Sequence, residues 1–401
     1  MSARVLRARW LLPIDRSPIE NGWVEVAGGR IVRTGAGRPP IPPHDLGDVA
    51  LLPGLVNAHT HLELSWLRGR VPPAGSMVEW IRALLATRAE GPGGEAERAD
   101  AVRAALDEMH ATGTVAAGDV TNTLMTPARL HERRMDGVVF YELLGFHAPS
   151  PMTQVREAWR RIDDVKKDVH DAHVAYSVAA HAPYSVSPAL FAEIARQRRD
   201  APLAVHLGES AEEIEFLRTG RGPFRDLLEW LGVWSDEWRP PECDPVEYLS
   251  RVGYLRAGLM AVHGVHLADD SLLKLRNAGA TVVTCPRSNE WVGAGLPRLA
   301  HFYGCGLAVA IGTDSLASVG SLSMFDELAA LRRIAPDVSA AALLDSATRR
   351  GAQALGLGDE FGTLAPGKRA ALVAVETPAD VGDVEEYLVS GVPASSIRRA
   401  A

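Results

Sequence analysis

The pattern of hydrophobic and polar positions differs between the middle of this chain and its two ends. Between residues 51 and 315, short apolar runs bounded by turn residues alternate with amphipathic segments of helical period. The apolar runs are LLPGLVNAH, TVAAGDV, GVVFYELLG, HVAYSVAAH, PLAVHLGE, LMAVHGVHL, ATVVTCPRSN and LAVAIGTDS. The helices predicted between them are Met77–Ala89, Glu95–Ala111, Met152–Val165, Pro188–Arg199, Ser271–Ala278 and Met324–Ile334. This alternation is typical of parallel strands joined by helices.

Eight apolar runs are the number that a (β/α)8 barrel of the TIM type requires. A doubly wound open sheet is the alternative, but no glycine-rich dinucleotide fingerprint follows the first run. The chain ends alternate at period two and are rich in turn residues, as in WVEVAGGRIVRTGAG and GTLAPGKRAALVAVE. We therefore predict an α/β fold with a catalytic barrel at residues 53–361. Both chain ends, residues 1–52 and 362–401, are predicted to form one small β-sandwich domain.

The composition of the 401 residues narrows the classes of function. Hydrophobic residues make up 47% and charged residues 23%, which is typical of a soluble globular chain. The formal net charge of −8 disfavours nucleic acid as a partner. No apolar run is long enough to span a membrane, and no signal peptide is recognisable. The three cysteines form no CxxC pair, so we predict a reduced, cytoplasmic protein.

Histidine and carboxylate residues recur where the apolar runs end. His59 and His61 close the first run, and alternate residues of a strand face the same side. The ends of later runs add His206, Glu209, His263 and Asp314. Barrel enzymes build their active sites at these carboxyl ends of the strands. Neutral imidazoles with a carboxylate favour a divalent metal, Zn²⁺ first, with Fe²⁺ or Mn²⁺ as alternatives.

Four segments that contain these residues resemble the amidohydrolase superfamily: PGLVNAHTHLE, VHLGES, VHG and GTDS. The resemblance covers nearly the whole chain, including the small sheet domain. It implies that one metal ion is held by His59, His61, His206 and Asp314. Binuclear members bridge two metals with a carboxylated lysine on the fourth strand, where this chain has His181. We therefore expect a single metal ion.

The spacing of His206 and Glu209 resembles the members that deaminate or dechlorinate nitrogen-containing aromatic rings. The resemblance implies that a metal-generated hydroxide attacks the ring carbon that bears the amino group. Glu209 moves a proton to the adjacent ring nitrogen, which makes that carbon electrophilic. Asp314 takes the hydroxide proton, and His263 hydrogen-bonds the attacking oxygen. Glu209, His263 and Asp314 are therefore the predicted catalytic residues.

Several further segments indicate the class of substrate. HAPYSVS (His181–Ser187) resembles a segment of adenosine-type deaminases whose histidine contacts the purine nucleoside. TCPRSNEW, GTDSLAS and FYELLG look more like the aminodeoxyfutalosine deaminases of menaquinone biosynthesis. We therefore predict the deamination of 6-amino-6-deoxyfutalosine to futalosine, with a purine nucleoside as the small-molecule partner.

This nucleoside carries a benzoate, which needs an aromatic platform and a partner for its carboxylate. Trp66 and Trp291 lie just past strand ends and are predicted to stack on a ring. Arg68 and Arg287 are predicted to bind the carboxylate with their planar guanidinium groups. Together with His181 they form the predicted substrate-binding set. A purely structural role is the alternative for each tryptophan and arginine.

Other functions stay open at this point. Deaminases of S-adenosylhomocysteine, adenosine or guanine, and chlorohydrolases of the same branch, share the metal set, so only the pocket separates them. A non-catalytic scaffold is a different class, disfavoured because all six expected site residues are present. The sequence does not decide between a monomer and a homo-oligomer. It also leaves open whether the tryptophan-rich residues 230–238 form a lid, a contact surface or ordinary packing.

Overall fold

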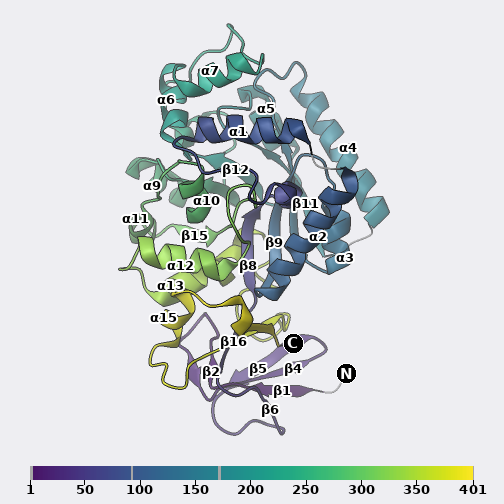
Figure 1. Cartoon of the computed structure of the whole chain (residues 1–401), viewed down its shortest axis with the longest axis vertical. Coiled ribbons are helices and arrows are strands. Elements are labelled where there is room, and N and C mark those ends of the chain that lie inside the picture. Colours follow the sequence, from purple (N-terminus) through teal and green to yellow (C-terminus); the bar gives the residue numbers. More distant parts are fainter. Residues whose placement is uncertain (1–2, 92–93, 170–172, 401) are drawn as a thin grey trace.

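The computed structural model describes residues 3–91, 94–169 and 173–400. It has two parts along its long axis: a barrel surrounded by helices, and a small all-β part that holds both chain ends (Figure 1). No helix in the three described ranges is long and apolar enough to cross a membrane. Cys243, Cys285 and Cys305 are free thiols.

The barrel consists of one parallel strand from each apolar run of the sequence. These strands are β8 (Leu55–Thr60), β9 (Thr114–Thr121), β10 (Asp136–Leu143), β11 (Val174–Ala180), β12 (Leu203–Leu207), β13 (Leu259–His263), β14 (Thr281–Thr284) and β15 (Ala308–Ile311). They form two parallel sheets, in the orders β11-β10-β9-β8 and β12-β13-β14-β15. A parallel bridge between Thr60 and Asp314 closes one seam. At the other seam, the backbone N–H of His206 donates to the carbonyl oxygen of His181. The predicted (β/α)8 barrel is confirmed.

Helices follow the strands and cover the outside of the barrel (Figure 1). They are α1 (Met77–Glu90), α2 (Glu95–Ala111), α3 (Pro127–Arg133), α4 (Pro151–Val169), α5 (Pro188–Gln197), α6 (Ala211–Thr219), α7 (Pro223–Trp230), α8 (Pro245–Arg251), α9 (Asp269–Ala278), α10 (Pro286–Trp291), α11 (Leu299–Gly304), α12 (Met324–Ile334), α13 (Ala340–Asp345) and α14 (Gly351–Ala354), with a 3-10 turn at Leu62–Leu67 and a π-helical turn at Ser346–Arg350. The six predicted helices are present with small shifts at their ends. Ser76, Ser187 and Ser323 cap α1, α5 and α12 by accepting a backbone N–H, which explains where these helices start.

Barrel strands are buried on both faces, which explains why their sequences are continuous apolar runs. On the inner face, Phe140 and Met260 belong to one buried cluster inside the barrel. On the outer face, Val139 and Val205 belong to the cluster that includes Phe191 of α5. Inward-facing residues at the strand ends therefore meet at the mouth of the barrel.

The small part contains two sheets, one of N-terminal strands alone and one that combines strands from both chain ends. Its strands are β1 (Arg4–Arg7), β2 (Trp10–Leu11), β3 (Ile19–Glu20), β4 (Trp23–Ala27), β5 (Arg30–Gly35), β6 (His44–Asp45), β7 (Val49–Pro53), β16 (Leu372–Glu376) and β17 (Ile397–Arg399). The sheet orders are β5-β4-β1-β6 and β17-β16-β7-β2-β3. Leu6 and Val24 of one sheet and Leu51 and Leu372 of the other share one apolar core. This confirms the predicted β-sandwich formed by both ends.

Two elements differ from the predicted division of the chain into two domains. Strand β7 runs one residue past the predicted boundary between residues 52 and 53. Helix α15 (Val384–Val389) falls in the predicted sheet domain, yet Leu388 belongs to the same apolar cluster as Leu328 and Leu343 of the barrel helices. A 3-10 turn at Ala394–Ser396 precedes β17. The boundaries themselves stay a prediction.

Candidate metal centre and active site

Three imidazoles and one carboxylate meet where the barrel strands end. His59 lies on β8 and His61 directly after it, and their Nε2 atoms are 3.2 Å apart. Asp314 Oδ1 lies 3.7 Å from Nε2 of His59 and 3.5 Å from Nε2 of His61. The ring centroid of His206, on β12, is 5.0 Å from that of His59. The structure brings the four predicted metal ligands together.

The backbone around Asp314 holds its side chain against the histidines. Asp314 has a φ of 60°, a left-handed conformation that is uncommon outside glycine and needs support from its surroundings. The Thr60 hydroxyl donates to the Asp314 carbonyl oxygen at 2.8 Å, and the Asp314 N–H donates to the His59 carbonyl oxygen at 3.1 Å. A Cβ at Gly312 would lie only 2.7 Å from Cβ of His59, so glycine permits this close approach of the two strands.

This group of side chains fits a metal ion. One ligand atom from each of His59, His61 and His206 lies within 4.8 Å of the other two. His206 Nε2 is buried and has no hydrogen-bond partner among the described residues, which is rare for a buried polar atom. Imidazole nitrogens with one carboxylate are typical ligands of Zn²⁺ and also suit Fe²⁺.

Burial sets the protonation states in the cluster. It lowers the pKa of His59 and brings that of His61 to about 4, so both rings are neutral near pH 7. Burial alone would raise the pKa of Asp314. The neighbouring His59, His61 and His263 instead hold this pKa well below its usual value. Neutral imidazoles and an ionised carboxylate are the forms that bind metals.

Glu142, on β10, is a residue of this site that the sequence analysis did not single out. Its Oε1 lies 3.6 Å from Nε2 of His206, and its Oε2 accepts a hydrogen bond from Asn122 at 3.0 Å. Burial lowers the pKa of His206, but Glu142, Glu209 and Asp314 outweigh this effect and raise it to about 9. A metal must therefore displace a proton from His206. The position of Glu142 near the end of an apolar run was the available signal.

Glu209 and His263 lie beside the cluster, and both are almost fully buried. Glu209 Oε2 is 3.5 Å from Nε2 of His263 and 3.9 Å from Nδ1 of His206. Burial raises the pKa of Glu209 to about 8; His206 opposes this rise, and the charge of Asp314 adds to it. A buried carboxyl that titrates near neutrality is suited to hold and transfer a proton.

Helix α10 supports the cluster through two neighbouring side chains. The Ser288 hydroxyl donates to Asp314 Oδ2 at 2.6 Å, and Asn289 Oδ1 lies 2.7 Å from Nδ1 of His263. Both side chains are fully buried. They belong to the segment TCPRSNEW, which the sequence analysis related only to substrate class. Their place at the end of the seventh apolar run was the signal for a site role.

His181 is the predicted substrate-binding residue that lies next to the cluster. Its ring centroid is 5.1 Å from that of His206, and its Nδ1 is 2.6 Å from the Ser185 hydroxyl oxygen. Burial lowers the pKa of His181 to about 4, so the ring is neutral near pH 7.

The other four predicted substrate-binding residues contact different partners. Trp66 is 7% exposed within an apolar cluster against which Trp291 packs. Arg68 pairs with an acidic side chain of α2, and Arg287 pairs with Glu327 of α12 at 3.4 Å. Within the described ranges, no hydrogen bond, ion pair or ring contact joins these four residues to the histidine cluster. Their role toward a substrate stays a prediction.

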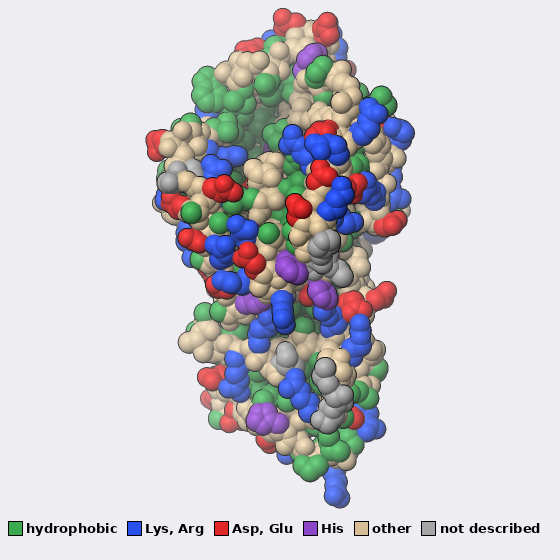
Figure 2. Space-filling view, turned by 90° about the vertical axis from the view of Figure 1, so that its right-hand side faces the viewer, with side chains coloured by type: hydrophobic (Ala, Val, Ile, Leu, Met, Phe, Trp, Pro, Cys, Tyr) green, Lys and Arg blue, Asp and Glu red, His purple; other side chains and the backbone are tan. Residues whose placement is uncertain are grey.

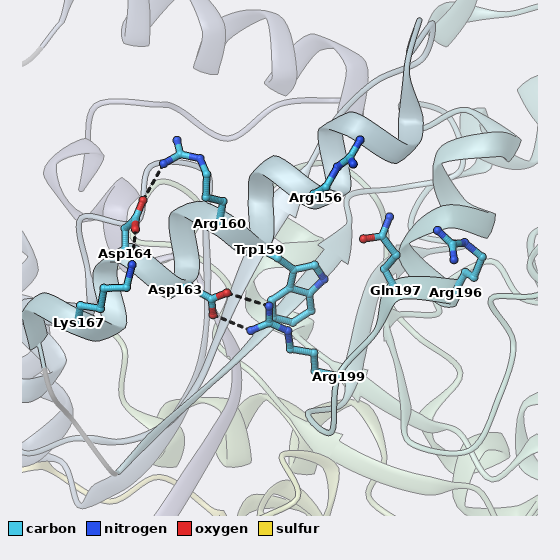
Figure 3. A pocket seen from close by; sticks show the side chains of 9 residues that line it. All are labelled: Arg156, Trp159, Arg160, Asp163, Asp164, Lys167, Arg196, Gln197 and Arg199. Carbon is cyan, nitrogen blue, oxygen red and sulfur yellow. Dashed lines mark hydrogen bonds and ion pairs between the residues drawn. The ribbon is translucent and has the colours of Figure 1, made fainter.

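A surface groove of about 640 Å³ lies between α4 and α5 on the outer wall of the barrel (Figure 3). Arg199 lies over Trp159, 4.1 Å from its ring centroid, and donates to both oxygens of Asp163. Arg160 pairs with Asp164 at 2.8 Å. Basic and acidic side chains are also interspersed over this side of the molecule (Figure 2). Paired surface charges of this kind contribute little to the stability of the fold, and they do not indicate a catalytic or binding site.

A family model described as "Amidohydrolase family" matches residues 50–397. The chain belongs to the amidohydrolase family. The match includes every residue of the histidine cluster, and it confirms the predicted family.

Two curated relatives and one solved structure are similar to this chain over most of its length. The aminodeoxyfutalosine deaminase of Deinococcus radiodurans is 28% identical over 326 residues, 76% of this chain and 73% of the relative. The 5-methylthioadenosine/S-adenosylhomocysteine deaminase of Nitratidesulfovibrio vulgaris is 29% identical over 398 residues, 94% of this chain and 84% of the relative. A solved adenosine deaminase from Xanthomonas campestris with bound zinc is 27% identical with a TM-score of 0.81, and the match covers 98% of this chain and 90% of that one.

Proposed function

We propose that this chain is a metal-dependent deaminase of adenine nucleosides. The observation that carries the proposal is the meeting of His59, His61, His206 and Asp314 at the barrel mouth, with protonatable Glu209 beside them. Hydrolysis of an amidine carbon–nitrogen bond needs an activated water and a proton donor, which such a group of residues can supply. The three similar proteins are all named deaminases, which supports the same reaction.

We propose one divalent ion, Zn²⁺ in the first place, as the cofactor held by His59, His61, His206 and Asp314. When bound, such an ion lowers the pKa of water and acts as a Lewis acid. The zinc in the Xanthomonas campestris structure supports the choice of metal. The unpartnered Nε2 of His206 supports the choice of ligand atom.

Three side chains handle the protons in the proposed reaction. Glu209, protonated at neutral pH because its pKa is raised, donates to the ring nitrogen beside the reacting carbon. Asp314, ionised and held by the Ser288 hydroxyl, accepts the proton of the attacking water. His263 is proposed to hydrogen-bond the attacking oxygen. One water is consumed and one ammonia is released, so the ring C–NH₂ becomes a carbonyl.

For the substrate we propose 6-amino-6-deoxyfutalosine, converted to futalosine for menaquinone biosynthesis. His181, beside the cluster, is proposed to contact the purine nucleoside. The Deinococcus radiodurans relative supports this substrate. The Nitratidesulfovibrio vulgaris relative aligns with a larger share of the chain and favours 5-methylthioadenosine or S-adenosylhomocysteine as the second candidate.

Ammonia release by zinc-loaded protein tests the proposal. The panel contains aminodeoxyfutalosine, adenosine, 5-methylthioadenosine, S-adenosylhomocysteine, guanine and a chlorotriazine. We expect the highest kcat/KM with aminodeoxyfutalosine and no turnover after removal of the metal. Preference for S-adenosylhomocysteine or 5-methylthioadenosine would establish the second candidate. Absence of turnover with every adenine nucleoside would contradict the deaminase proposal, and a chain that binds no metal would favour a scaffold.

A further inference from the structure

Glu213 is a fully buried acidic residue that the proposed reaction does not use. It lies on α6, close behind Glu209 in the chain, and its side chain has no exposed surface. Its Oε1 accepts a hydrogen bond from the backbone N–H of Gly208 at 3.0 Å, and its Oε2 accepts one from the backbone N–H of Glu209 at 3.0 Å. Because both oxygens accept, the side chain binds as a carboxylate, and hydrogen bonds to a charged group are stronger than neutral ones. Glu213 thus holds the turn that carries Glu209.

The turn between β12 and α6 has a backbone that needs such support. It joins the fifth barrel strand to the helix through residues 208–210. Gly208 has a φ of 59°, and a Cβ there would lie 2.4 Å from Cδ2 of Leu267, so glycine is required. Among the described residues, no acceptor other than Glu213 binds the N–H of Gly208 or of Glu209. Loss of this carboxylate would leave two N–H groups of a buried turn unpaired.

The carboxyl group of Glu209 depends on this turn for its position. Within the described ranges no hydrogen bond holds the carboxyl itself, and its nearest polar neighbours are His263 at 3.5 Å and His206 at 3.9 Å. The backbone of Glu209 therefore sets where the carboxyl lies, and Glu213 fixes that backbone. Proton transfer needs a donor within hydrogen-bond reach of the accepting atom, and a misplacement of about 1 Å can slow a reaction by about 100-fold.

Capping of α6 is the simpler interpretation of Glu213, but the geometry differs from it. Ser210 and Glu213 have the Ser-x-x-Glu spacing of a capping box, and Oγ of Ser210 accepts from the N–H of Glu213 at 3.3 Å. In a capping box, the glutamate accepts in return from the N–H of the serine. Here the Glu213 oxygens bind the N–H groups of Glu209 and Gly208, which precede the serine. The side chain therefore anchors the turn that carries Glu209.

We propose that Glu213 is a positioning residue, which places the Glu209 carboxyl for proton transfer by binding the backbone N–H groups of Gly208 and Glu209. This role rests on the proposed function, in which Glu209 donates the proton, and it adds the residue that places the donor. Within the described part of the chain, no hydrogen bond or ion pair joins Glu213 to a proposed metal ligand. Its loss should therefore slow the reaction and leave zinc affinity unchanged.

Steady-state kinetics of full-length, zinc-loaded variants test the proposal, with the adenine nucleoside that the wild type turns over fastest as the substrate. Glu213→Gln keeps the size of the side chain, but its NH₂ group replaces one acceptor, so one backbone N–H loses its partner. We expect kcat to fall by about 10–100-fold, while KM and the zinc dissociation constant stay unchanged. Ser210→Ala is the matched control, because it removes the cap of the same helix and keeps both Glu213 oxygens as acceptors. It should lower Tm and leave kcat near the wild-type value.

A double variant tests whether Glu213 acts through Glu209. In Glu209→Gln the proton donor is already lost, so the additional change Glu213→Gln should lower kcat little further. Losses that multiply in the double variant would overturn the proposal. It would also be overturned by a wild-type kcat in Glu213→Gln, by an equal fall of kcat in Ser210→Ala, or by loss of zinc binding in Glu213→Gln.

If Glu213→Gln does not fold, amide hydrogen exchange of the wild-type protein gives the answer without a variant. The N–H groups of Gly208 and Glu209 should exchange slowly, because the buried carboxylate holds both. Exchange of these two groups as fast as that of an exposed loop would overturn the proposal. Absence of turnover by the wild type with every adenine nucleoside would instead contradict the proposed function.

Discussion

Glu209 illustrates how burial changes the chemistry of a single residue. An exposed glutamate is ionised at neutral pH, but burial raises the pKa of this carboxyl to about 8. The same residue lies within 4 Å of two histidines of the site, His206 and His263. A proton donor is therefore available where the proposed reaction needs one.

Glu209→Gln tests this role because glutamine keeps the size of the side chain but cannot pass on a proton. We expect kcat to fall by about 10²–10⁴-fold, while one equivalent of zinc remains bound. Ammonia release and elemental analysis measure the two quantities. Glu215→Gln, at an exposed position of helix α6, which begins two residues after Glu209, should change neither. An unchanged kcat in Glu209→Gln would remove Glu209 from the proton path.

Glu327 gives a prediction on pH. It is fully buried, and burial raises its pKa to about 8, although Arg287 acts in the opposite direction. The folded state therefore holds a proton that the unfolded state releases above about pH 4.5, so the free energy of unfolding should fall as the pH rises from about 5 to 8. Glu327→Gln should make this decline smaller in urea unfolding at several pH values. An unchanged decline in Glu327→Gln, equal to that of the exposed control Glu290→Gln, would contradict the assignment.

Among the elements, β11 and β12 are bridged by one side chain in addition to the backbone bond between His206 and His181. These strands belong to different sheets, and the fully buried Tyr254 lies between them. Its hydroxyl accepts from the N–H of Ala180 and donates to the carbonyl oxygen of Ala204, both at 3.1 Å. The tyrosine hydroxyl thus pairs with one backbone N–H and one backbone carbonyl oxygen at this seam.

Tyr254→Phe removes only this hydroxyl and leaves a buried N–H and a buried carbonyl unpaired. We expect the free energy of unfolding to fall by about 1–3 kcal/mol, because buried polar groups are costly without partners. Urea unfolding measures the change. Tyr387→Phe is the control, since its hydroxyl bonds to the Glu376 carbonyl oxygen at an exposed position. Equal losses in the two variants would show that the seam does not depend on Tyr254.

At the scale of the whole molecule, the proposed metal joins distant parts of the chain. His59 lies on the first barrel strand, His206 on the fifth, and Asp314 follows the last. A ligand that binds only the folded state stabilises it by mass action, by about 2.7 kcal/mol at a hundredfold excess over Kd. Metal binding and barrel closure are therefore expected to be coupled.

Removal of the metal by chelation should lower Tm by several degrees, and added zinc should restore it. Calorimetry with and without zinc measures this shift. In His206→Ala the shift should be largely absent, because a ligand is missing. A shift of wild-type size in His206→Ala would show that His206 does not hold the metal.

Much of this architecture was predictable because its signals are local. The eight apolar runs became the eight barrel strands, since a strand buried on both faces needs a continuous apolar sequence. The polar residues that end these runs meet in space, because parallel strands of a closed barrel all end at one mouth. His59, His61, His206 and Asp314 could therefore be named together without coordinates.

The sequence alone thus determined the barrel, the sandwich made by both ends and the central cluster. Only the tertiary structure decided which further side chains contact the histidines, such as Glu142 beside His206 and Asn289 beside His263. It also placed Trp66 among apolar neighbours and Arg287 beside acidic ones, with no hydrogen bond, ion pair or ring contact to the histidines among the described residues. The physical reason is that periodicity sets which way a residue faces. Contacts between different strands and loops depend on register, barrel closure and packing, which no local pattern of residues contains.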